Sequence, residues 1–153
     1  DSLDADKLIR LCDGNMDDLI DFLKKTEYKK ATELLSESTV LFEKWIDDSL
    51  STELSEEIVA FCFNLYEDGE NEWSVEIVGT NSFDKNDPDW ACSEIFDNRD
   101  NLLGWECEET YEDVLSTIKS FLKRYMKQGK YQTLLLSKKG IGVGFVDGDL
   151  ELL

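Results

Sequence analysis

The nine-residue run Ile58–Tyr66 constrains the fold of this chain more than any other segment does. It is apolar on both of the faces that a strand would present, and it is rich in residues that favour strands. This composition is typical of a central strand that is buried on both faces. We therefore expect Ile58–Tyr66 to lie inside a sheet.

The next segment has the alternation of a strand that is buried on one face only. In Trp73–Ile77 the apolar residues alternate with Ser74 and Glu76, so we expect Ser74 and Glu76 on a wet face. The polar stretch before it contains Asp68-Gly69, a pair that is typical of tight hairpin turns. Two shorter strands are expected further along the chain, at Trp90–Phe96 and Leu102–Cys107.

The clearest helix is Tyr111–Gln128, whose apolar residues recur at helical spacing. Thr110 precedes this helix and is a suitable N-cap, with Asp113 three residues further on. Gly129 follows the helix, and we expect this glycine to end it in the left-handed conformation. Residues 1–50 also carry a helical pattern, in which Trp45 lies on an apolar stripe.

Two strands complete the predicted order of elements. Ile141–Val146 is expected to be a strand, and Asp147-Gly148 can turn the chain into a last short strand. This order predicts an α+β protein, with an antiparallel sheet of about four to six strands packed against helices and a helical N-terminal third. We expect a single domain over residues 1–153, with segments at 1–50 (mostly helical), 58–107 (strands), 111–128 (helix) and 141–153 (terminal strands).

The charge of the chain is strongly negative and unevenly distributed. Its 153 residues include 35 acidic and 16 basic side chains, which give a formal net charge of −19, and there is no His. Nucleic acids and anionic lipids are bound through Lys and Arg, so we expect neither as a partner. The absence of His excludes Ser-His-Asp and Cys-His catalytic systems. Residues 31–118 hold 24 acidic side chains, against which stand only Lys44, Lys85 and Arg99.

This acidic middle of the chain predicts a surface that binds a basic protein partner. We expect the contacts to come from clustered carboxylates, with neighbouring Trp side chains as apolar anchors. The candidate partner-binding residues are Glu67, Asp68, Glu70, Glu72, Trp73, Asp84, Asp87, Asp89, Trp90, Trp105, Glu106, Glu108 and Glu109. Two other interpretations stay open. The acidic surface could serve solubility alone, and the three Trp side chains could pack inward from the ends of strands.

Two further motifs are open to a chemical and to a structural interpretation. Gly140, Gly142 and Gly144 resemble a phosphate-binding loop, but a strand follows where such a loop needs a helix. We interpret them as a glycine face that lets another segment approach the strand closely. Asp147 and Asp149 could hold Mg²⁺ or act as an acid–base pair, although a hairpin turn explains both. We expect no metal, no cofactor and no catalytic residue, and keep a metal-assisted hydrolase as an alternative.

The cysteines indicate a reducing compartment. The four Cys residues form no CxxC motif, and a chain of this length does not need disulfides to fold. We therefore expect reduced thiols in a cytoplasmic protein. Because the chain begins at Asp1 rather than Met, an upstream segment such as a removed signal peptide stays open as well.

Two short pieces of the sequence carry a resemblance to a known class. Gly144–Asp149 with Leu150–Leu153 after it is similar to the ends of bacterial immunity proteins, and the stretch from Val78 to Cys92 is loosely similar to them too. These proteins neutralise polymorphic or contact-dependent-inhibition toxins. The resemblance implies a bacterial, cytoplasmic inhibitor that binds a cognate basic toxin domain, for example a nuclease. The alternative is an acidic regulatory or adaptor module for a protein that is not a toxin.

Overall fold

The computed structural model describes residues 37–153. Within them, Leu41–Leu153 forms a compact unit. The helices that the sequence predicts before residue 37 lie outside the described residues, and the single domain over residues 1–153 stays a prediction. Within the described part, residues 37–50 are helical, as expected for the end of the N-terminal segment. Among residues 37–153, no helix combines the length and the apolar character that a membrane span needs.

The α+β architecture is confirmed, with a sheet of six strands. The strand order is β3-β2-β1-β5-β6, and β4 pairs with β2 beyond this path. β1 lies in the interior of the sheet, between β2 and β5, as its apolar sequence predicts. The elements are β1 (Ala60–Gly69), β2 (Glu72–Thr80), the short helix η1 (Pro88–Cys92), β3 (Glu94–Asp97), β4 (Leu103–Glu106), α3 (Tyr111–Gln128), α4 (Gln132–Leu136), β5 (Gly140–Phe145) and β6 (Glu151–Leu152).

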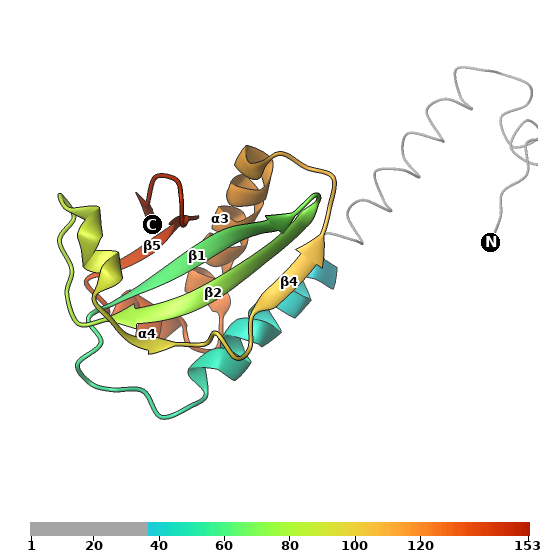
Figure 1. The fold of residues 1–153 in the computed structure, drawn as a ribbon. Coiled ribbons are helices and arrows are strands. Elements are labelled where there is room, and N and C mark those ends of the chain that lie inside the picture. The colour runs from blue at the N-terminus through green and yellow to red at the C-terminus, as the bar shows by residue number, and fades with distance from the viewer. Residues whose placement is uncertain (1–36) are drawn as a thin grey trace, which may run out of the picture. The chain divides into compact units, whose positions relative to one another are not determined.

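One pairing differs from the expected antiparallel sheet, because β5 runs parallel to β1. The remaining pairs are antiparallel. A parallel pair needs a long crossover connection, and α3 with α4 lies in the connection that returns the chain to β1. Figure 1 shows α3 behind the β1–β2 hairpin.

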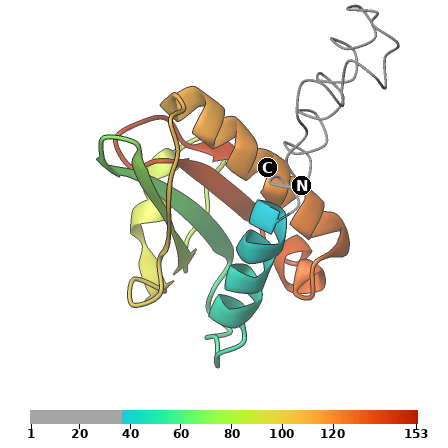
Figure 2. The same cartoon turned by 90° about the vertical axis from the view of Figure 1, so that its right-hand side faces the viewer.

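The helices cover one face of the sheet, and the main core lies between the helices and that face. Figure 2 shows α3, α4 and the helix that ends at residue 50 on the same side of the strands. Alternate residues of the strands point into this core, among them Phe63 of β1, Ile77 of β2 and Val143 of β5. Trp45 packs there as the sequence predicts, and Leu122 and Tyr125 enter from α3. On this face the apolar side chains of β1, β2 and β5 are therefore buried, whereas Trp105 of β4 is only half-buried.

The opposite face, here called the outer face, is covered by a smaller layer. Trp90 of η1 packs there against Ala60, Cys62 and Val78, with Phe83 and Leu150 at its margin. The outer face of β5 consists of Gly140, Gly142 and Gly144. A Cβ atom on Gly144 would lie 2.5 Å from the carbonyl oxygen of Asp149, and one on Gly142 would lie 3.1 Å from the Trp90 ring. The expected close approach to a glycine face is thus confirmed.

The ends of α3 agree with the sequence at one terminus and differ at the other. The backbone N–H of Asp113 donates to the Thr110 side chain, so the predicted N-cap is present. Gly129 follows the helix, but its φ of −71° and ψ of 157° are extended, so the left-handed conformation expected there is wrong. The chain proceeds at once into α4, and a Cβ atom on Gly129 would collide with the Tyr125 ring at 2.6 Å. Gly129 is therefore required for space rather than for a positive φ.

Candidate functional site

The β1–β2 hairpin brings one of the predicted acidic groups to the end of the sheet. β1 extends to Gly69 and β2 begins at Glu72, so the tight turn is Glu70-Asn71 rather than Asp68-Gly69. Asn71 adopts a φ of 60°, a left-handed conformation that Asn tolerates better than most residues. An irregularity in the pairing between Glu67 and Gly69 shifts the register before this turn. The hairpin tip therefore carries Glu67, Asp68, Glu70 and Glu72, all of them exposed.

A second predicted acidic group joins the first through the pairing of β4 with β2. Glu106 is the register partner of Glu72, and Trp105 is the register partner of Trp73. The chain continues from Glu106 to Glu108 and Glu109 and then enters α3, whose first turn carries Glu112 and Asp113. A shallow hollow between the hairpin turn and the start of α3 is lined by residues of both groups, including Glu70, Glu108, Glu109 and Asp113. Residues 34 or more apart in the chain thus meet at one place.

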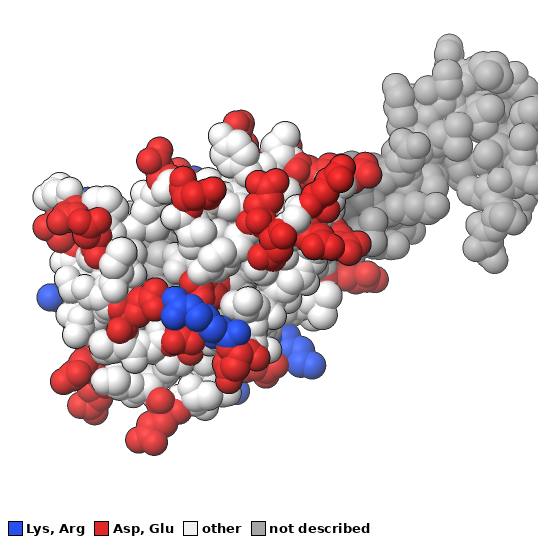
Figure 3. All heavy atoms as spheres, in the orientation of Figure 1, with Lys and Arg blue, Asp and Glu red and all other residues white. Residues whose placement is uncertain are grey.

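A third stretch of carboxylates lies near the same end of the sheet. The turn between β5 and β6 carries Asp147 and Asp149, and a groove that includes both of them also includes Glu67. We name this set the acidic end: Glu67, Asp68, Glu70, Glu72, Glu106, Glu108, Glu109, Glu112, Asp113, Asp147 and Asp149. The three stretches that supply it, residues 66–73, 104–113 and 145–150, contain no Lys or Arg. In Figure 3 the acidic side chains crowd the end of the sheet where the β1–β2 hairpin turns.

The third predicted acidic group lies elsewhere. Asp84, Asp87 and Asp89 are exposed in the loop that follows Thr80 and leads into η1. Thr80 ends β2 and Glu72 begins it, and a strand of that length spans roughly 26 Å at about 3.3 Å per residue. The candidate site therefore divides into an acidic end and a separate loop, here called the Asp84 loop.

The predicted apolar anchors are corrected by the structure. Trp73 is 3% exposed and packs in the main core, where its ring meets Phe145 and its indole N–H donates to the Cys107 carbonyl oxygen. Trp90 is 4% exposed and lies against Phe83 on the outer face. Trp105 is half-buried and packs against the core. Trp73 and Trp90 are therefore too deeply buried to anchor a partner. Trp73 packs inward from the start of β2, as the alternative interpretation has it. Trp90 also packs inward, but from η1, so the strand expected at Trp90–Phe96 is wrong in its first half.

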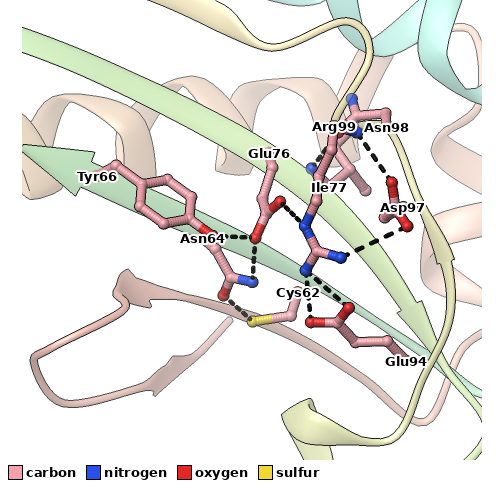
Figure 4. A network of polar contacts seen from close by, with 9 residues as sticks. All are labelled: Cys62, Asn64, Tyr66, Glu76, Ile77, Glu94, Asp97, Asn98 and Arg99. Carbon is pink, nitrogen blue, oxygen red and sulfur yellow. Dashed lines mark hydrogen bonds and ion pairs between the residues drawn. The ribbon is translucent and has the colours of Figure 1, made fainter. Parts of the chain in front are cut away.

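A polar network on the outer face is the part of the molecule that the sequence did not reveal. Glu76 was expected on a wet face, but its side chain is 1% exposed and Ser74 is also buried. The Oε1 atom of Glu76 accepts hydrogen bonds from the amide of Asn64, at 3.0 Å, and from the hydroxyl of Tyr66. Its Oε2 atom lies 2.9 Å from the Nε atom of Arg99. Figure 4 shows these donors converging on the carboxylate.

Arg99 links the buried carboxylate to the surface. Its guanidinium binds both carboxylate oxygens of Glu94, at 2.9 and 2.7 Å, and lies 3.5 Å from Asp97. The hydrogen bonds to Glu94, together with the charge of Glu76, raise the pKa of Arg99 above its usual value. Beside it, Asn98 is buried and accepts a bond from the backbone of Ile77 while donating to Ser49. Arg99, one of the three cations of the acidic middle, is thus paired with carboxylates of this chain.

The two acidic protons of this network are held firmly at neutral pH. Burial, followed by the hydrogen bond to Glu76, raises the pKa of Tyr66 to about 12. Burial, followed by the negative charge of Glu76, raises the pKa of Cys62 to about 12, and the Cys62 thiol donates to the side-chain oxygen of Asn64. Neither group is a nucleophile in this state, since the thiolate and the phenolate are the reactive forms. What these side chains do is bind one another: Cys62 donates to Asn64, and Asn64 and Tyr66 donate to Glu76.

The sequence held one signal for this network. Arg99 is one of only three cations among residues 31–118, and such a cation is expected to have carboxylate partners. The partner Glu76 could be identified only from the register of β2 with β3, which places Val78 opposite Asp97 and so brings Arg99 near Glu76.

Metal binding and the comparisons complete the description of the site. Within residues 37–153, no group of three or more Cys, Asp or Glu side chains is arranged to hold a metal ion. Asp147 and Asp149 are exposed on the turn between β5 and β6. The chain matches no protein-family model, no curated protein and no solved structure.

Proposed function

We propose that this chain is an inhibitor of the immunity-protein type, which binds a basic toxin domain in the bacterial cytoplasm through its acidic end. The observation that supports this proposal is the gathering of carboxylates from three separate stretches of the chain at one end of the sheet, where those stretches supply no cation. Like charges at this density repel one another and reduce stability. A basic partner would offset that repulsion on binding.

A toxin that cleaves nucleic acid suits this surface. Such an enzyme holds the phosphate backbone with Lys and Arg, and a cluster of carboxylates can occupy the same positions. Opposite charges also speed the encounter of the two proteins and make the rate sensitive to salt. The inhibitor needs no chemistry of its own, and we propose that it is not an enzyme.

The cognate toxin is sought as the product of the neighbouring gene, and its basic domain is tested for 1:1 binding. We expect tight binding that weakens steeply as salt is raised, together with protection of cells that express the toxin. A triple variant of the hairpin tip, Glu67→Gln with Glu70→Gln and Glu72→Gln, should weaken binding. A matched variant of the Asp84 loop, Asp84→Asn with Asp87→Asn and Asp89→Asn, removes the same number of charges and should have a much smaller effect.

The outcomes separate this function from the two other interpretations. Equal losses in both triple variants would mean that net charge alone attracts the partner. Failure to bind or to protect against any adjacent toxin would overturn the immunity function. Binding to a basic protein that is not a toxin would favour the regulatory or adaptor module instead.

A further inference from the structure

A groove of about 620 Å³ opens between the start of α3 and the turn that joins β5 to β6. Its apolar lining includes Tyr111, Leu115 and Phe145. The rings of Tyr111 and Phe145 meet edge to face, with 6.0 Å between their centroids. Tyr111 is 56% exposed although Phe145 is nearly buried, so the groove leaves an aromatic wall open to solvent.

Carboxylates border this apolar lining without a matching cation. Glu67, Asp147 and Asp149 line the groove and are exposed. None of the three forms an ion pair with a cation of residues 37–153. The one neutralised carboxylate of the groove is Glu151, whose Oε1 atom lies 3.1 Å from the Nζ atom of Lys119. The groove therefore combines exposed apolar surface with uncompensated negative charge.

We propose that this groove receives a Lys or Arg side chain of the basic protein partner, an inference that rests on the function proposed above. The aliphatic stem of such a side chain would pack on Tyr111 and Leu115, while its cation would meet Asp147 and Asp149. A cation that lies over the Tyr111 ring gains additional attraction from the ring electrons.

Other occupants fit the groove less well. A purely apolar side chain would take the carboxylates out of water with no compensation. A compact cation with no stem would leave the aromatic wall exposed. The groove thus selects one side-chain chemistry, and it would supply the apolar anchor that the buried Trp73 and Trp90 do not provide.

The groove is tested directly with short peptides and nuclear magnetic resonance. The probe is an acetylated and amidated peptide, Ala-Gly-Lys-Gly-Ala, titrated at millimolar concentration into the full chain. Two matched peptides replace its Lys. Norleucine keeps the stem without the charge, and diaminopropionate, at a pH low enough to keep its amine protonated, keeps the charge without the stem. We expect saturable shifts at Tyr111, Leu115 and Phe145 with the Lys peptide, and clearly weaker shifts with both others.

Two outcomes of this titration would overturn the proposal. In one, the diaminopropionate peptide binds as well as the Lys peptide, which would mean that charge alone is recognised. In the other, the Asp84 loop shifts as much as the groove does, since that loop offers exposed carboxylates without an apolar wall. Variants provide a second readout. Tyr111→Ser and Asp149→Asn should each lower the affinity for the Lys peptide by about three- to five-fold. Asp87→Asn in the Asp84 loop should leave the affinity unchanged.

The peptide experiment distinguishes failure of this inference from failure of the proposed function. Localised binding of the Lys peptide with no toxin partner would support the groove and overturn the function. A basic toxin could also bind tightly with an affinity that neither Tyr111→Ser nor Asp149→Asn changes. That result would support the function and overturn the groove.

Discussion

Glu76 and Arg99 form an ion pair across the boundary between the interior and the surface, with 2.9 Å between Oε2 and Nε. The carboxylate is 1% exposed, whereas the guanidinium is 48% exposed. The negative charge is therefore buried on β2, and its compensating positive charge reaches it from solvent, held in place by Glu94 and Asp97. Arg99, one of the few cations in this region, thus compensates the charge of a carboxylate that is buried in the sheet.

Removal of this cation should destabilise the fold. In Arg99→Met the carboxylate of Glu76 stays buried without a compensating charge, and we expect the free energy of unfolding to fall by about 2 kcal/mol, less than for a fully buried pair because Arg99 is half-exposed. Urea unfolding measures this change. Lys85→Met removes an exposed cation of the same region and is the control. The double variant Glu76→Gln with Arg99→Met should recover part of the loss. Equal stability of Arg99→Met and Lys85→Met would contradict the role of the pair.

Substitution of Gly144 should disrupt the outer layer. In Gly144→Ala the new Cβ atom would lie 2.5 Å from the Asp149 carbonyl oxygen, and the backbone must shift to relieve the contact. We expect a loss of about 2 kcal/mol, typical of overpacking in a tight site. Gly104→Ala is the matched control, since its Cβ atom would be 3.6 Å from the nearest heavy atom, and its effect should stay within about 1 kcal/mol. Similar losses in thermal or urea unfolding of both variants would refute the steric explanation.

Alkaline pH should weaken the fold through Tyr66. Its pKa is about 12 in the folded chain, above the value of about 10 expected when the chain unfolds. Between these two values the folded state holds more protons, so stability decreases as pH rises. Burial and the bond to Asp47 raise the pKa of Tyr125 as well, which adds to the same trend. Unfolding measured from about pH 10 to 12 should show a shallower decline in Tyr66→Phe and in Tyr125→Phe. An unchanged decline in both variants would exclude these phenols as its source.

Thiol labelling should distinguish Cys62 from Cys92. Cys62 is fully buried and its pKa is about 12, so its thiolate is scarce and shielded at neutral pH. Cys92 is exposed at the end of η1. Iodoacetamide should therefore modify Cys92 in the folded chain and reach Cys62 only after unfolding. Mass spectrometry of the two peptides reads the outcome. Modification of Cys62 at the rate of Cys92 would mean that the outer face opens readily.

Neutralisation of Glu106 should change stability and partner binding in opposite directions. Glu106 and Glu72 are register partners on adjacent strands, and like charges placed opposite each other are destabilising. Glu106→Gln should therefore raise the free energy of unfolding by about 0.5 kcal/mol while weakening the binding of a basic partner. Urea unfolding and a binding titration measure the two effects. The alternative in which the acidic surface serves solubility alone predicts the gain in stability with no loss of binding.

The elements that the sequence predicted well are those determined by local pattern. The bounds of α3 follow from one apolar stripe and from the Thr110 cap, both of which lie within the helix or next to it. The central place of β1 follows from its apolar composition. The predicted hairpin turn lies two residues too early, because Asp68-Gly69 is a strong turn signal. In the structure a pairing irregularity lies there, and the chain turns at Asn71.

The candidate site could be predicted only as separate pieces. The sequence gives no means of knowing that Glu72 lies opposite Glu106, because that contact depends on the register of strands 34 residues apart. The burial of Trp73 depends in the same way on which face of β2 meets the helices. The prediction for Glu76 is wrong in the opposite direction, because it expected an exposed side chain. An alternating pattern predicts a solvent-exposed face only where nothing packs on that face, and here Arg99 and its loop cover Glu76. In both cases the deciding partner comes from a distant part of the chain.

The parallel pairing of β1 with β5 has a consequence for the synthesis of this chain. β1 and β2 can meet as soon as their hairpin has been made, but β1 is left with one open edge until β5 arrives. Some seventy residues separate the two strands, and α3 and α4 lie between them. During translation the most apolar strand of the chain therefore keeps one unpaired edge until β5 is made. An unpaired edge of this kind recruits other strands. Glu56 and Glu57 before this edge, and Glu67 and Asp68 after it, give two such nascent chains like charges that repel one another.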